Sequence, residues 1–214
     1  MSTTPEDRTY QESSLCSLGP QPQVMTAAFV ALFRDHFASA DNIEHAVFRE
    51  RLYTGSTAED STGILIEDAS VWTPTRTARR PAIIIKRNGW QHTKRLAGAN
   101  TGKISEDYTE HVTYMQGSHT VFCMSPNGGE TEVLAAEVYR HLMRYSEIFR
   151  KYFTLQRFVL GDIGPLSILQ ETTIHFAVPI SVAYGWQERW LLKKHAATIT
   201  DTRLAAIFEQ YYGS

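Results

Sequence analysis

The sequence has little cysteine and no residue spacing typical of a metal or nucleotide site. Of its two cysteines, Cys16 and Cys123, the second lies in an apolar run, and we expect both to be free thiols. The eight histidines form no HxxxH or HxH pair. The glycine-bearing turns lack the GxxxxGK(S/T) and GxGxxG arrangements that bind phosphate groups. We therefore expect no metal and no cofactor.

A signal peptide, a membrane-spanning segment and a strong net charge are also missing. The chain begins MSTTPEDRTYQESS, without a basic start or an apolar core, and no run approaches the ~18 apolar residues of a membrane span. The formal net charge of −2 gives no global attraction to nucleic acid or to an anionic membrane. Neither a GxSxG elbow nor a Cys/His signature of a nucleophilic enzyme occurs. These absences favour a protein that binds other proteins and is not an enzyme.

The 214 residues divide into three parts by composition. Residues 1–20 are polar, show no periodicity and predict a flexible arm. Residues 21–186 predict one compact domain, since 43% of the whole chain is hydrophobic. Residues 187–214 predict a helical extension, around Leu191 and again after Asp201, which can cap a helix.

Hydrophobic periodicity predicts two main helices. Apolar residues recur at helical spacing over 24–37, and again over 130–153 after the turn at 125–129. Short β-branched or alternating runs predict strands at 81–86, 111–124 and 174–184, the last within a hairpin. Residues 91–107 predict a polar loop. Together these elements indicate an α/β (α+β) fold, with a mainly antiparallel four-stranded sheet packed against two main helices.

The clearest strand, at 174–184, alternates apolar residues with smaller or polar ones. Its even positions should face the core, because side chains repeat every two residues in a strand. These positions are Ile174, Phe176, Val178, Ile180, Val182 and Tyr184. Pro179 cannot donate a ladder hydrogen bond, so an edge or a bulge is expected there. The partner strand is 158–160 or 166–170, across the turn at 161–165.

One local group of basic residues is a candidate interface. It consists of Arg76, Arg79, Arg80, Lys94 and Arg95. A solvated surface or a subunit contact is the favoured interpretation. Contact with a phosphate backbone is less favoured, because no aromatic stacking platform or helix-turn-helix pattern accompanies the cluster.

The order of helix, two strands, long helix and hairpin resembles that of bacteriophage tail terminators. The similarity covers about residues 21–186, and the segments PAIII, TVFCMSP and TIHFAVPISVAYGW fall where that family places its sheet. These proteins cap the completed tail tube of long-tailed phages as a hexameric ring, and they offer the surface to which the DNA-filled head docks. The N-terminal arm, residues 41–80 and the extension after Trp186 depart from the compact members of the family.

The resemblance implies a structural virion protein of the tail or neck, assembled in the host cytoplasm, with no enzymatic activity and no cofactor. Its partners would be further copies in a homo-hexameric ring, the tail tube protein and a head–tail connector. DNA would only pass through the central channel, and no membrane would be bound. Because basic rings would hold phosphates, the channel wall should avoid basic side chains. Glu106, Asp107 and Glu110 are candidates for this wall, and the alternative is that they are only solvated. Another neck or head-completion connector is an alternative, and a small cytoplasmic enzyme or ligand-binding domain is a further one.

Overall fold

The structure is a computed structural model, and the residues that it describes are 20–59, 61–77, 79–93, 101–103, 108–169 and 175–193. Within these ranges, the side chains of residues 93, 101–103, 108–111 and 189–193 are not described. The described residues fall into two compact units. Residues 20–91 and 116–186 belong to the larger one, and the remainder belong to the other. No helix of the described part is both long and apolar enough to cross a membrane.

Both predicted main helices are confirmed. Helix α2 spans Pro22–Phe37, with proline in its first turn, where a missing N–H costs nothing. Helix α4 spans Gly128–Tyr152, and the Asn127 side chain caps it by accepting hydrogen bonds from the backbone N–H groups of Gly129 and Glu130. The shorter helical pieces are η1 (Ala40–Asn42), α3 (Ala46–Arg49) and η2 (Pro74–Thr77).

The described strands form one mostly antiparallel sheet in a mixed α/β fold, with the main order β1-β2-β5-β8-β6. These five are β1 (Leu65–Asp68), β2 (Ala82–Arg87), β5 (Tyr108–Ser125), β8 (Phe176–Lys193) and β6 (Arg157–Ile163). The expectation of four strands is wrong, because the short β1 adds to β2 as a parallel neighbour. Off this path, β3 (Gln91–Thr93) and β4 (Thr101–Lys103) pair with β5, and β7 (Ser167–Ile168) pairs with β8.

Two further expectations are corrected. The helix predicted around Leu191 is instead the end of strand β8, which continues to Lys193. Hydrogen bonding to the equally long β5 overrides the helix propensity of this stretch. The polar loop predicted at 91–107 contains the short strands β3 and β4, because β5 offers both of them backbone partners. The remainder of the predicted C-terminal extension, at 194–214, lies outside the described residues, as does the N-terminal arm up to residue 19.

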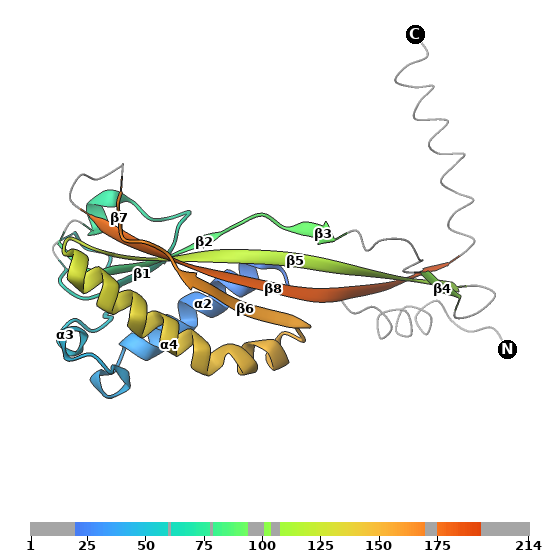
Figure 1. The fold of residues 1–214 in the computed structure, drawn as a ribbon, viewed down its shortest axis with the longest axis horizontal. Coiled ribbons are helices and arrows are strands. Elements are labelled where there is room, and N and C mark those ends of the chain that lie inside the picture. The colour runs from blue at the N-terminus through green and yellow to red at the C-terminus, as the bar shows by residue number, and fades with distance from the viewer. Residues whose placement is uncertain are drawn as a thin grey trace, which may run out of the picture. The chain divides into compact units, whose positions relative to one another are not determined.

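One face of the sheet carries the main core, and both long helices cover it (Figure 1). The Phe29 ring of α2 stacks on the Phe149 ring of α4, with centroids 5.1 Å apart. Beneath the helices, the even-numbered side chains of β8 confirm the predicted register from Val178 to Tyr184, whereas Phe176 is half-buried and Ile174 lies outside the described residues. The buried members are Val178, Ile180, Val182, Tyr184 and Trp186. Ser181 and Ala183, on the alternate positions, are exposed.

The start of β8 is buried on both faces, which the alternation did not predict. Ala177 belongs to a second apolar cluster on the other side of the sheet, with Leu65, Ala82, Ile84 and Met124. Trp72 and Leu169 pack against this cluster and remain partly exposed. His175 is buried beside it, and its Nε2 lies 2.7 Å from the carbonyl oxygen of Thr77. Residues 72–77 therefore cover part of the face of β8 that carries the smaller and more polar side chains.

A bulge lies beside Pro179, opposite Ser181. Both proposed partner segments pair with β8, through β6 and β7. The register along β6 shifts between Leu160 and Ile163, which pair with Val182 and Ile180. The N–H of Gly164 donates to the Pro179 carbonyl at 2.8 Å, so the bulge lies on the side where proline lacks a donor.

The register of β8 predicts opposite outcomes for two adjacent substitutions. Ile180→Asp places an unpaired charge at a position with 0% exposure, so we expect a loss of several kcal/mol of unfolding free energy. The matched control Ser181→Asp lies on the exposed face and should cost under ~0.5 kcal/mol. Chemical denaturation of both variants measures the difference, and equal stabilities would contradict the assigned faces.

Candidate interaction surface

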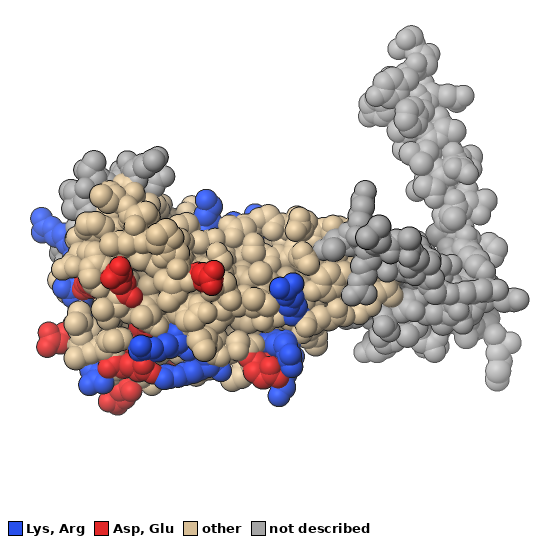
Figure 2. Space-filling model, viewed as in Figure 1, with Lys and Arg blue, Asp and Glu red and all other residues tan. Residues whose placement is uncertain are grey.

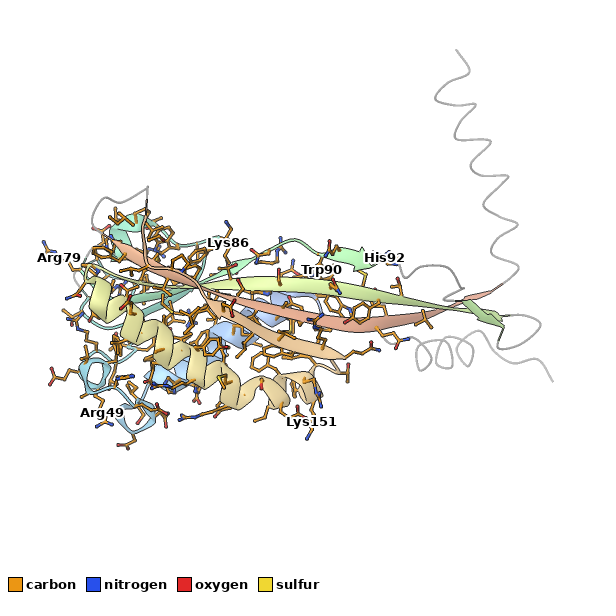
Figure 3. The ribbon with its side chains drawn as sticks, in the orientation of Figure 1. Arg49, Arg79, Lys86, Trp90, His92 and Lys151 are labelled. Atoms are coloured by element: carbon orange, nitrogen blue, oxygen red, sulfur yellow. The ribbon has the colours of Figure 1, made fainter. Side chains whose placement is uncertain are left out.

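The three described members of the predicted basic cluster differ in exposure and in their partners. The Arg76 guanidinium bonds both carboxylate oxygens of Glu67, at 3.1 and 3.3 Å. Arg80 is buried, with 1% exposure, and donates to the carbonyls of Arg76 and Ser56. Of the described members only Arg79 is exposed, and it points away from the body (Figure 3). No signal in the sequence indicated the burial of Arg80, because the carbonyls that it bonds belong to the surrounding backbone, and its assignment to an interface stays a prediction.

The remaining predicted site residues cannot be placed. Lys94 and Arg95 of the candidate interface lie outside the described residues, as do Glu106 and Asp107 of the candidate channel wall. The backbone of Glu110 belongs to β5, where it pairs with Gly102, but its side chain is not described.

Strands β6 and β7 expose apolar side chains that the sequence analysis did not select. We name Val159, Ile163, Leu166 and Ile168, which are 36–61% exposed, the edge surface. Ile163 and Ile168 pair with Ile180 and Phe176 of β8, Leu166 lies between the two strands, and Val159 pairs with Ala183 and so lies on the other face of the sheet. Strand β6 ends the main order of the sheet, and no strand of the described part pairs with its outer side. Exposed apolar residues beside an open strand edge are typical of a protein–protein contact. The alternation in β6 and β7 was too short to indicate this surface beforehand.

The opposite edge of the sheet, at β1, is by contrast covered in part by an arginine side chain. In β1 the N–H of Leu65 bonds the Pro81 carbonyl toward β2, so the neighbouring Ile66 directs its backbone groups outward. The Arg34 guanidinium of α2 donates to this outward Ile66 carbonyl at 3.0 Å. The same guanidinium lies 5.3 Å from the centroid of the Tyr53 ring. An added strand would have to displace Arg34, so β6 is the more accessible edge.

Helix α4 adds exposed apolar side chains to a charged outer face. Met143, Ile148 and Tyr152 are 55%, 56% and 79% exposed. On the same helix, Arg140 and Arg144 pair with Glu44, whose pKa is lowered chiefly by its hydrogen bond to Arg144. Figure 2 shows acidic and basic side chains gathered over α4 and the α3 segment, whereas the visible area of the strands is largely uncharged.

Beneath this face, the buried carboxylate of Glu137 joins α2, α4 and the segment before α3. It is 2% exposed and lies 2.9 Å from His36 Nε2. It also accepts hydrogen bonds from the backbone N–H groups of Glu44 and His45, at 3.0 and 3.3 Å. Three donors satisfy the charge, so we assign Glu137 a structural role. The His141 ring lies 3.9 Å from the His36 ring, and burial lowers the pKa of His141 to about 4.

A second buried network centres on His119, which is fully buried between the sheet and α2. Its Nε2 lies 2.8 Å from the Thr26 hydroxyl oxygen, and its Nδ1 lies 3.0 Å from the Tyr184 hydroxyl oxygen. Thr26 donates to the Pro22 carbonyl, so it accepts a hydrogen bond from His119, and His119 accepts one from Tyr184. Burial lowers the pKa of His119 to about 4 and raises that of Tyr184.

Two shallow depressions adjoin the start of α2. They have volumes of about 370 and 440 Å³ and share Gln23 and Arg87 in their linings. Trp90, 40% exposed, lines the larger one, so an aromatic side chain does accompany a basic residue here. The expectation that no aromatic side chain accompanies the basic stretch overlooked Trp90, which lies three residues after Arg87. No group of three potential metal ligands occurs in the part of the chain described by the structure.

Neither a protein-family model nor a curated protein matches this chain.

The two buried histidines predict a loss of stability on acidification. As the pH falls from about 6.5 to about 4, the unfolded chain binds protons at His119 and His141 while the folded protein does not, so protonation favours unfolding. Below about pH 4 both histidines are protonated in the folded and in the unfolded state, so the loss of unfolding free energy that they cause no longer grows. Denaturant titrations across this range should show a loss of order 3 kcal/mol for each histidine.

A pair of variants isolates this effect. His141→Phe removes one titrating group, so the pH dependence should become shallower. The control His92→Phe alters an exposed histidine of β3 and should retain the original dependence. An identical slope in all three proteins would contradict the role assigned to His141.

Proposed function

We propose that this protein is a structural component of a bacteriophage virion, a tail terminator that forms a ring on the tail tube. The ring ends polymerisation of the tube and offers a docking surface to the head connector, while leaving a channel for DNA. The ring size of six and the identity of the partners rest on the family resemblance. The single observation that carries the proposal is the arrangement of two helices on one face of a mostly antiparallel sheet, in the element order that resembles this family.

The edge surface supports assembly through protein contacts. A ring requires each subunit to present two different patches, so that each patch meets its complement on a neighbour. The two edges of the sheet differ in chemistry, because exposed apolar side chains lie beside the open edge of β6, whereas Arg34 covers the Ile66 carbonyl of β1. Termination needs no covalent chemistry. One face of the ring would copy the docking geometry of the tube and bind its end, and the other face would lack this geometry, so no further tube subunit could add.

Deletion of the gene in the virus tests the function directly. Overlong tubes of variable length without heads, seen by electron microscopy, are the expected result. Tails of normal length joined to filled heads would contradict the proposal.

A substitution on the edge surface tests the contact separately from the fold. Ile168 is 61% exposed, so Ile168→Asp should change the unfolding free energy by under ~0.5 kcal/mol. It should nevertheless weaken ring formation on tail tubes by at least about tenfold, because a charge is buried at the contact. The matched control Val47→Asp, at a position 56% exposed on α3, should assemble normally. Electron microscopy of each protein mixed with tube protein measures capping. Equal capping by both variants would exclude this surface.

A further inference from the structure

Arg80 is a buried cation with an unused hydrogen-bond donor. Its side chain is 1% exposed. The Nε atom donates to the Arg76 carbonyl at 2.7 Å, and Nη1 donates to the Ser56 carbonyl at 2.8 Å. The remaining nitrogen, Nη2, is buried and has no hydrogen-bond partner among the described residues. An arginine stays charged at physiological pH, so both the charge and the free donor need compensation.

The acidic group that acts most strongly on the charge of Arg80 is Glu67, and this carboxylate is already paired with Arg76. Glu67 is 6% exposed, and Arg76 occupies both of its carboxylate oxygens. Within the described part of the chain, no carboxylate oxygen lies within 4 Å of Arg80. Glu67, Arg76 and Arg80 therefore carry two positive charges and one negative charge. Burial accordingly lowers the pKa of Arg80, which shows that its charge is poorly solvated.

A segment without regular secondary structure contacts Arg80 through a backbone carbonyl. Residues 54–59 are exposed, and Ser56 supplies the carbonyl that Arg80 bonds. Gly55 adopts a φ of 75°, a conformation that favours glycine and lets the segment turn. Next to Arg80, the exposed Arg79 points outward and makes no ion pair with a described residue (Figure 3).

We propose that Arg80 binds an oxyanion, such as a phosphate or a carboxylate, through Nη2. One such anion balances the excess positive charge of the cluster and satisfies the free donor, since guanidinium groups bind planar and tetrahedral oxyanions well. The exposed Arg79 next to Arg80 adds a second positive charge that attracts the anion. This inference stands independently of the proposed ring, because it rests on the chemistry within one subunit.

Thermal unfolding in inorganic phosphate tests the site. At matched ionic strength, phosphate in place of chloride should raise the midpoint by about 5 °C, with a saturable dependence on concentration. Arg80→Met should abolish this rise, and it should not lower the midpoint in chloride, because it removes a buried unpaired charge. The control Lys86→Gln alters an exposed cation and should retain the full response (Figure 3). No saturable response in the unaltered protein, or an equal response in Arg80→Met, would overturn the proposal.

A second variant keeps the test decisive if Arg80→Met fails to fold. Arg80→Lys retains the charge but loses the forked donors, so the phosphate concentration for half of the response should rise at least about tenfold. An unchanged half-saturating concentration would overturn the assignment of Nη2.

Size-exclusion chromatography distinguishes the two sources of the oxyanion. If the site takes a free anion, phosphate should stabilise the protein without changing its oligomeric state. If a carboxylate of a second copy fills the site, phosphate should dissociate the oligomer, and Arg80→Met should be dissociated without phosphate. Either result supports the oxyanion site, whereas dissociation by chloride to the same extent contradicts it.

Discussion

The even-numbered side chains of β8 must be removed from water, and the arrangement of the larger unit depends on this requirement. Val178, Ile180 and Val182 occupy one face of a strand inside the sheet, and α2 and α4 cover that face. Burial of each such side chain contributes about 1.5–3 kcal/mol. The stacked Phe29 and Phe149 rings then hold the two helices against each other above the strand. The edge of β6 remains at the side of this layer, and no described strand pairs with its outer side.

Buried polar groups in the larger unit fall into two kinds. Glu137 and His119 are surrounded by partners from different elements, so their hydrogen bonds specify how α2, α4 and the sheet meet. Arg80 differs, because one of its donors is unused and its charge has no carboxylate within ion-pair distance among the described residues. A satisfied network has a structural explanation, whereas the unsatisfied cation points to a group from outside. Because of this contrast, we assign a structural role to Glu137 and propose an oxyanion-binding role for Arg80.

The proposed assembly and the proposed oxyanion site involve separate parts of the molecule. The edge surface lies on β6 and β7 and is apolar, whereas Arg79 and Arg80 follow η2 and are cationic. A protein that assembles through several neighbours needs patches of different chemistry, so that each neighbour finds only its own.

Local patterns in the sequence determined both main helices, the buried face of β8 and the bulge at Pro179, because these depend on spacing and on proline within a few residues. Only the tertiary structure decided that β1 joins the sheet, that β8 continues past Trp186 and that Arg80 is buried. Each of these depends on partners distant in the chain: β2 for β1, β5 for the end of β8, and the Ser56 carbonyl for Arg80. Propensity and charge at a position carry no information about such partners. A strand formed from helix-favouring residues and an arginine buried without an acid therefore became visible only in the folded chain.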